Sequence, residues 1–178
     1  MSKHIILEGF MGSGKSTIGI RLSYKMAMTV TDTDKLIERE QQRKISDIFA
    51  EDGEEAFRQM ETECLKNLER QGHAQIISLG GGVPMRKKNR EILKKLGMVV
   101  YLRAKPETIY ERVKSDTTRP LLQCDDPFAR ICELMEARAA MYEEAADVII
   151  DTDNLSVEQV LTDIIREAKK RGIQSCSY

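Results

Sequence analysis

The sequence predicts an α/β protein in which helices cover both faces of a five-stranded parallel sheet. Short apolar segments alternate about five times with longer segments whose apolar residues recur at helical spacing. Each connection between two strands is long enough for a helical crossover, which parallel pairing requires. The chain has 178 residues and no internal repeat or linker, so we expect one domain over residues 1–178.

The predicted strands are continuous apolar runs, as expected for strands that are buried on both faces of a parallel sheet. The run from Met98 to Leu102 is the clearest, and Ile5 to Leu7 leads directly into a glycine-rich turn. The segment 30–34 has the weakest pattern. In chain order the predicted strands are 5–7, 30–34, 75–79, 98–102 and 148–150.

Helices are predicted between these strands from apolar periodicity and from residues that start or stop helices. Pro106 and Pro127 occupy first-turn positions, and Ser156 with Gln159 forms a capping box. The segment 54–70 carries its apolar residues on one helical face: Ala56, Phe57, Met60, Cys64, Leu65 and Leu68. The helices are predicted to begin near residues 15, 35, 54, 86, 106, 127 and 156.

Charge and hydropathy exclude several classes of partner. Lys and Arg number 28 and Asp and Glu number 29, which gives a net charge of -1 with both signs spread along the chain. Because no basic block is present, we expect no nucleic-acid partner. No segment approaches the roughly 20 apolar residues that span a bilayer, so we expect no membrane association and a cytoplasmic location. No exposed apolar stripe stands out from the core pattern, so we expect a monomer.

The segment Gly9 to Ser16 reads GFMGSGKS and fits the pattern G-x-x-x-x-G-K-[ST] between a predicted strand and a predicted helix. Glycines there let backbone N–H groups point at phosphate oxygens, and the helix N-terminus adds about half a positive charge. We therefore predict a P-loop that binds ATP. The structural alternative is a glycine-rich turn that matches the pattern by chance.

Residues of the P-loop have separate predicted tasks. Lys15 supplies a cation to the β- and γ-phosphates, Ser16 is placed to ligate the Mg²⁺ that the nucleotide brings, and Thr17 assists at the α-phosphate. The expected nucleotide ligands in this loop are Gly12, Ser13, Gly14, Lys15, Ser16 and Thr17.

Five further motifs follow the P-loop along the chain: Thr31-Asp32-Thr33-Asp34, Phe57-Arg58, Gly80-Gly81-Gly82, Arg119-Pro120-Leu121-Leu122, and Arg138 followed by Tyr142. In order and approximate spacing, over nearly the whole chain, they resemble the shikimate kinase family. The resemblance implies a P-loop fold like that of nucleoside monophosphate kinases. It also implies transfer of the γ-phosphoryl group of MgATP to a ring hydroxyl of shikimate.

Asp32 and Asp34 lie two residues apart, so both carboxylates would face the same way on an extended strand end. By the resemblance, Asp32 holds Mg²⁺ through a water, whereas Asp34 binds acceptor hydroxyls and orients or deprotonates the attacking one. The alternative is a solvated turn in which one of the two caps the next helix.

The resemblance assigns Arg58 and Arg138 to the carboxylate of the acceptor, a task that suits a planar, always-charged fork. It assigns Gly80, Gly81 and Gly82 to the same ligand, because backbone without side chains can approach a small polar molecule. The structural alternatives are arginines in surface ion pairs and a glycine bulge.

The polar segment 115–126 resembles the mobile lid of the family, and its Arg119 is expected to approach the transferring phosphoryl group. Arg112 is expected to stack on the adenine. The alternatives are an exposed loop arginine at 119 and a helix-surface arginine at 112.

Three features depart from the family pattern, and one of them is that the segment from Tyr24 to Met28 lacks a glycine at the helix end. Glu8 precedes the P-loop where a small apolar residue is usual; it is either a partner near the metal or a residue facing solvent at the end of the sheet. The segment Asp151-Thr152-Asp153-Asn154 lies where the family closes over the base, but it lacks the arginine that some members place there.

Two other functions remain open from the sequence. One is a different small P-loop kinase, acting on gluconate or on a nucleoside monophosphate. The other is a regulatory protein that binds a nucleotide without transferring phosphate. An acceptor panel would separate them, because only a kinase for shikimate would release ADP in response to shikimate alone.

Overall fold

The computed structural model describes residues 4–116 and 124–173. Five parallel strands form one sheet in the order β2-β3-β1-β4-β5. The strands are β1 (His4–Glu8), β2 (Val30–Asp32), β3 (Ile76–Ser78), β4 (Gly97–Arg103) and β5 (Val148–Asp151). The predicted parallel α/β architecture is therefore confirmed.

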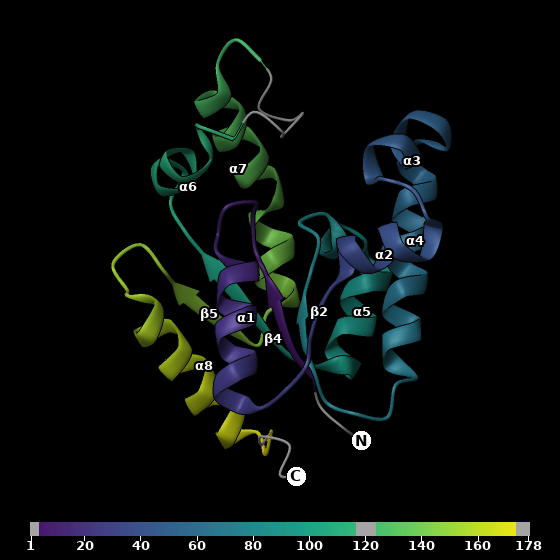
Figure 1. The fold of residues 1–178 in the computed structure, drawn as a ribbon. Coiled ribbons are helices and arrows are strands. Elements are labelled where there is room, and N and C mark those ends of the chain that lie inside the picture. The colour runs from purple at the N-terminus through teal and green to yellow at the C-terminus, as the bar shows by residue number, and fades with distance from the viewer. Residues whose placement is uncertain (1–3, 117–123, 174–178) are drawn as a thin grey trace.

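Helices lie on both faces of this sheet (Figure 1). α1 and α8 pack on one face, whereas α4 and α5 pack on the other. The helices are α1 (Lys15–Met26), α2 (Thr33–Gln41), α3 (Ile45–Glu51), α4 (Gly53–Glu69), α5 (Lys87–Leu96), α6 (Pro106–Val113), α7 (Pro127–Ala145) and α8 (Val157–Lys170), with a short 3₁₀ turn η1 (Val83–Met85). None of the described helices combines the length and apolarity needed to cross a membrane.

The central strand β1 separates two apolar cores. Ile5 and Leu7 belong to the core under α1 and α8, whereas Ile6 belongs to the core under α4 and α5. This division follows from the alternation of side chains along a strand. All three side chains are fully buried, which fixes the register of β1 against β3 and β4.

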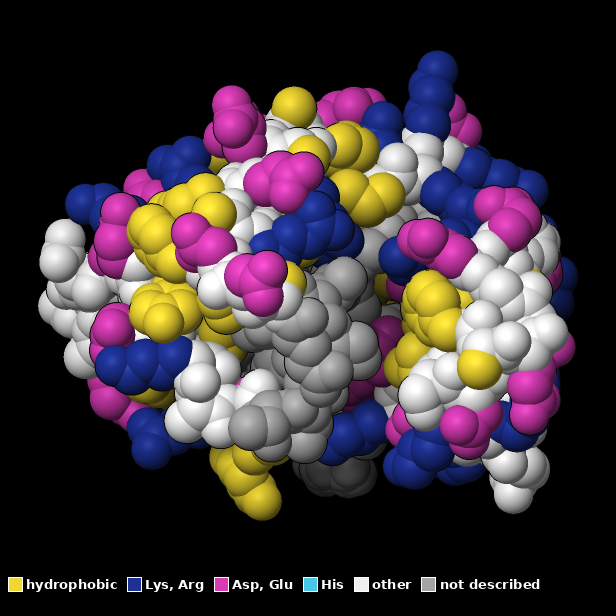
Figure 2. Space-filling model, turned by 90° about the horizontal axis from the view of Figure 1, so that it is seen from above, with side chains coloured by type: hydrophobic (Ala, Val, Ile, Leu, Met, Phe, Trp, Pro, Cys, Tyr) yellow, Lys and Arg dark blue, Asp and Glu magenta, His cyan; other side chains and the backbone are white. Residues whose placement is uncertain are grey.

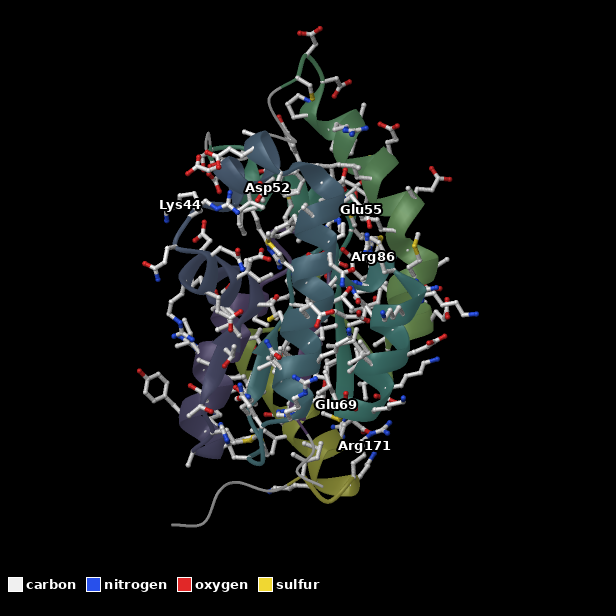
Figure 3. All side chains as sticks on the ribbon, turned by 90° about the vertical axis from the view of Figure 1, so that its right-hand side faces the viewer. Lys44, Asp52, Glu55, Glu69, Arg86 and Arg171 are labelled. Atoms are coloured by element: carbon white, nitrogen blue, oxygen red, sulfur yellow. The ribbon has the colours of Figure 1, made fainter. Side chains whose placement is uncertain are left out.

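A buried polar bridge joins α4 to the segment that follows β3. Thr62 on α4 donates from Oγ1 to Asn89 Oδ1 on α5 over 2.7 Å, and Asn89 Nδ2 donates to the Val83 carbonyl of η1 over 2.9 Å. Nearby, Arg86 forms an ion pair with Glu55 of α4 (Figure 3). These contacts hold α4, η1 and α5 together as one unit.

Candidate active site

A cavity of about 550 Å³ opens at the carboxyl ends of the strands, where ligands gather in open α/β sheets. Seen from above, the molecule is hollowed beside the part formed by α3 and α4, and charged side chains border the hollow (Figure 2). The lining includes residues 11–17, Asp32, Asp34, Gly80, Gly81, Arg112, Thr152 and Leu155.

The loop between β1 and α1 has the geometry of a phosphate cradle. Gly12 and Gly14 have φ angles of 75° and 98°, a left-handed conformation that favours glycine. A side chain at Gly14 would meet nothing within 4 Å, so the loop leaves open space at the start of α1. Lys15 Nζ donates to the carbonyls of Gly9 and Phe10 over 2.8 and 3.0 Å, which holds its ammonium over the loop. An anion placed here would meet backbone N–H groups, the helix dipole and this cation.

The expectation that Asp32 and Asp34 lie together on one extended strand end is wrong, because the strand stops before Asp34. β2 ends at Asp32, and Asp34 already lies in the first turn of α2. Asp32 is the N-cap of this helix: its Oδ1 accepts hydrogen bonds from the backbone N–H groups of Asp34 and Lys35 over 3.1 and 3.2 Å. Its Oδ2 accepts no hydrogen bond in the described parts of the chain. Both carboxylates nevertheless line the cavity.

Asp34 lies against the first of the three glycines. A Cβ atom at Gly80 would collide with the Asp34 carboxylate, so a larger residue there would displace this side chain. The Gly80 N–H donates to Thr33 Oγ1 over 2.9 Å, which ties the start of α2 to the end of β3. Burial and the neighbouring charge of Asp32 raise the pKa of Asp34 to about 6, whereas Lys15 and Arg58 lower it. At pH 7 Asp34 is therefore mainly ionised.

Arg58 of α4 lies against the third glycine, because a Cβ atom at Gly82 would collide with its guanidinium. Its Nη1 donates to Glu61 Oε2 over 2.9 Å, and its Nη2 donates to Glu54 Oε1 over 3.0 Å. Glu61 is 1% exposed, and burial raises its pKa to about 7 although Arg58 lowers it. These two carboxylates hold the guanidinium of Arg58 in place.

Glu61 was not among the residues expected at the site from the sequence. The available signal was its position on the otherwise apolar face of α4, four residues after Phe57 and four before Leu65. A carboxylate on such a face needs a partner, and Arg58 lies three residues before it.

Arg138 of α7 approaches the middle glycine. A Cβ atom at Gly81 would lie 3.9 Å from Arg138 Nη1 and 3.6 Å from the Tyr142 hydroxyl. The Tyr142 hydroxyl donates to the Gly81 carbonyl over 2.6 Å, and the Tyr142 ring stacks on Tyr101 with centroids 5.0 Å apart. The three glycines thus bring Asp34, Arg58 and Arg138, from three separate helices, around one short stretch of backbone.

The opposite side of the cavity is less charged. Arg112 on α6 donates from Nη1 to the Gly12 carbonyl over 3.1 Å and lines the cavity. Asp153 Oδ1 accepts from the Lys105 N–H over 2.9 Å and from Thr108 Oγ1 over 2.6 Å, which fixes the loop after β5 to the start of α6. Thr152, Leu155, Val157 and Val160 form the remaining wall.

Glu8 and Arg119 differ in how the structure bears on them. Glu8 is 0% exposed, so the expectation that it faces solvent is wrong. Arg119 and most of the predicted lid lie in 117–123, outside the described residues.

The fold and the cavity define an α/β protein of the P-loop class, with a cradle for a polyphosphate beside one carboxylate and two arginines that lie against Gly80–Gly82. The family model for shikimate kinase matches residues 11–169. The chain belongs to the shikimate kinase family.

Relatives and solved structures agree with this placement. The chain is 48% identical over 162 residues to the shikimate kinase of Bacillus mycoides, covering 91% of this chain and 96% of the relative. It is 40% identical over 171 residues to that of Symbiobacterium thermophilum, covering 95% and 98%. A solved shikimate kinase from Acinetobacter baumannii, in complex with shikimate, superposes with a TM-score of 0.88 at 32% identity, covering 98% and 97% of the two chains.

Proposed function

We propose that this protein transfers the γ-phosphoryl group of MgATP to a ring hydroxyl of shikimate. The observation that carries the proposal is that one cavity joins the phosphate cradle to Asp34, Gly80 and Gly81, and that Arg58 and Arg138 lie against the same short stretch of glycine backbone. The name shared by its relatives and the shikimate complex of the Acinetobacter baumannii enzyme support the same acceptor.

The nucleotide half is built from the P-loop. The backbone of Gly12, Ser13 and Gly14 surrounds the phosphates, Lys15 adds a full charge, and Thr17 borders the α-phosphate. Arg112 and the wall around Leu155 border the base. We assign the metal to the Ser16 hydroxyl and to Asp32, because both line the cavity and oxygen ligands suit Mg²⁺. When bound, the metal neutralises charge on the β- and γ-phosphates.

The acceptor half is built around the glycines. Arg58 and Arg138 provide paired donors for a carboxylate, and the backbone at Gly80–Gly82 is open to the same small ligand. Asp34, ionised at neutral pH, accepts a hydrogen bond from the attacking hydroxyl and orients it toward the γ-phosphorus. As the new O–P bond forms, the bond to the ADP oxygen breaks and the hydroxyl proton leaves toward Asp34. We assign Arg119, from the predicted lid at 115–126, to the charge on the moving group.

An acceptor panel tests this function. ADP formation is measured with shikimate, gluconate and nucleoside monophosphates at equal concentrations. We expect release above background with shikimate alone. A larger response to gluconate or to a monophosphate would assign the protein to another kinase, and equal background release with every acceptor would favour a regulatory nucleotide-binding protein.

Replacing Arg58 with alanine is expected to raise the KM for shikimate by about 30- to 100-fold, with a smaller change in kcat. A hydrogen bond to a charged group contributes about 1.5–3 kcal/mol, and Arg58 is held for such a bond by two carboxylates. Steady-state kinetics of Arg58→Ala, Arg58→Lys and the control Arg70→Ala, near the exposed end of the same helix, provide the measurement. An unchanged KM in a folded Arg58→Ala variant would remove this residue from the acceptor site.

Replacing Asp153 with alanine is expected to raise the KM for ATP by about tenfold and to leave the KM for shikimate unchanged. The loss of two hydrogen bonds, each contributing about 0.5–1.5 kcal/mol, frees the loop after β5 from α6. Asp163→Ala is the control, at a partly exposed position of α8 where the carboxylate pairs with Arg166. If the KM for shikimate rose instead, the loop would belong to the acceptor half.

We further propose that the chain works as one domain over 1–178, as a monomer and in the cytoplasm. Size-exclusion chromatography with light scattering tests the oligomeric state at working concentrations. A mass corresponding to a dimer at those concentrations would contradict the proposed monomeric state.

A further inference from the structure

Glu8 is a buried carboxyl group beside the phosphate cradle that the proposed reaction does not use. It ends β1 and directly precedes Gly9, the first residue of the P-loop. Its side chain is 0% exposed, and neither Oε1 nor Oε2 has a hydrogen-bond partner in the parts of the chain that the structure describes. Buried polar groups normally find a partner, so an exception beside a ligand site calls for an explanation.

The surroundings of Glu8 come from four elements. By strand alternation its side chain lies on the same face as Ile6, and its register partner is Tyr101 on β4. The charged and titratable groups that act on it are Lys15 of the P-loop, at the start of α1, Asp147 before β5, Tyr101, and Tyr142 on α7. Of these, Lys15 is the cation, and its ammonium is held on the Gly9 and Phe10 carbonyls.

Burial raises the pKa of Glu8 to about 9, and Asp147 adds to this shift while Lys15 opposes it. A carboxyl in this position is therefore neutral at pH 7. An ionised Glu8 would place a negative charge under the loop that has to receive phosphates.

We propose that Glu8 is a positioning residue that controls nucleotide affinity through its proton. When Glu8 is protonated, it does not compete with the bound phosphates for the positive charge of Lys15. Ionised, it attracts Lys15 and repels the phosphates. The inference rests on the nucleotide half of the proposed function, and it makes no use of the acceptor.

The direction of the effect follows from linkage. A bound polyphosphate disfavours the ionised carboxylate, so nucleotide binding and Glu8 protonation stabilise each other by the same factor. The ionised fraction of Glu8 grows as the pH rises through its pKa. Nucleotide affinity should therefore be constant well below pH 9 and fall above it.

The test is direct binding of MgADP, without any acceptor, between pH 7 and pH 10. The comparison is between wild type and Glu8→Gln, whose amide has the shape of the protonated acid and does not titrate. We expect the wild-type Kd to rise by about tenfold more than the Glu8→Gln Kd over this range, since one titrating group near pH 9 gives that ratio.

Proton uptake provides a second readout. Calorimetric titrations at pH 9 in buffers of different ionisation enthalpy should show about half a proton taken up per MgADP by wild type, as expected for a group half-ionised at that pH. Glu8→Gln should take up fewer protons per MgADP than wild type. A purely structural Glu8 would change the thermal stability but leave the two pH profiles parallel, and parallel profiles would overturn the proposal.

A replacement variant and the separate acceptor assay cover two other outcomes. If Glu8→Gln does not fold, Glu8→Leu replaces it, because leucine is also neutral at every pH and should give the same flat profile; a steep profile in Glu8→Leu would overturn the proposal. A wrong acceptor assignment would show in the acceptor panel and leave these binding curves unchanged, so the two failures can be distinguished.

Discussion

Changing Arg119 to alanine is expected to lower kcat by about 10³- to 10⁵-fold, the range found for arginines that stabilise a phosphoryl group in transfer. The KM for shikimate should change little, because a charge that acts only in the transition state does not contribute to ground-state binding. In the sequence, Arg119 follows α6 and precedes α7; Arg112 on α6 lines the cavity, and Arg138 on α7 lies near Gly81.

Steady-state kinetics with Arg119→Ala and Arg119→Lys measure this effect. The lysine variant should recover part of the loss, because it restores charge without the planar fork. Arg130→Ala, in a surface ion pair with Glu133 on α7, serves as the control. A turnover number within a few fold of wild type in Arg119→Ala would assign the catalytic charge to another residue.

Changing Lys15 to methionine is expected to lower kcat by about 10²- to 10³-fold or more and to weaken nucleotide binding. Loss of one preorganised electrostatic group at a reacting centre has this magnitude, and Lys15 is held in position by two backbone carbonyls. The length of methionine preserves packing, so the loss reports on the charge.

The matched control for Lys15→Met is Lys25→Met on the same helix, where the lysine pairs with Glu158 at the surface. We expect near-normal kcat and ADP affinity for this control. Normal turnover by Lys15→Met would show that the cradle binds phosphate without help from its lysine.

The parts of the fold that depend on local chemistry could be predicted from the sequence. The P-loop lies between β1 and α1 as expected, because the glycine turn and the start of the helix both depend on residues that are adjacent in the sequence. The capping box of Ser156 and Gln159 is present, with Gln159 accepting from the Ser156 N–H over 2.7 Å. Strands β1, β3 and β4 follow from apolar runs that are buried in the structure, whereas β2 and β5 are partly exposed.

The parts that depend on distant contacts could not be predicted. Nothing local shows that the strand stops at Asp32 and that α2 begins at once, so that Asp32 both ends β2 and caps α2. The burial of Glu8 depends on β4 and α7, which follow it by about 90 and 120 residues or more in the chain. The expected roles of Arg58 and Arg138 came from the family resemblance, because the two residues lie on separate helices and no local pattern shows that both reach the glycines.

The cavity walls have a consequence for folding. They are contributed by segments that range from Met11 to Val160, so the pocket exists only when almost the entire chain has acquired its native arrangement. A ligand of this pocket therefore binds the folded state and not its unfolded counterpart. At a hundredfold excess over its Kd, such a ligand adds about 2.7 kcal/mol to the free energy of unfolding. Cellular nucleotide would in this way protect the protein against unfolding, and a chain interrupted before α8 would lose that protection.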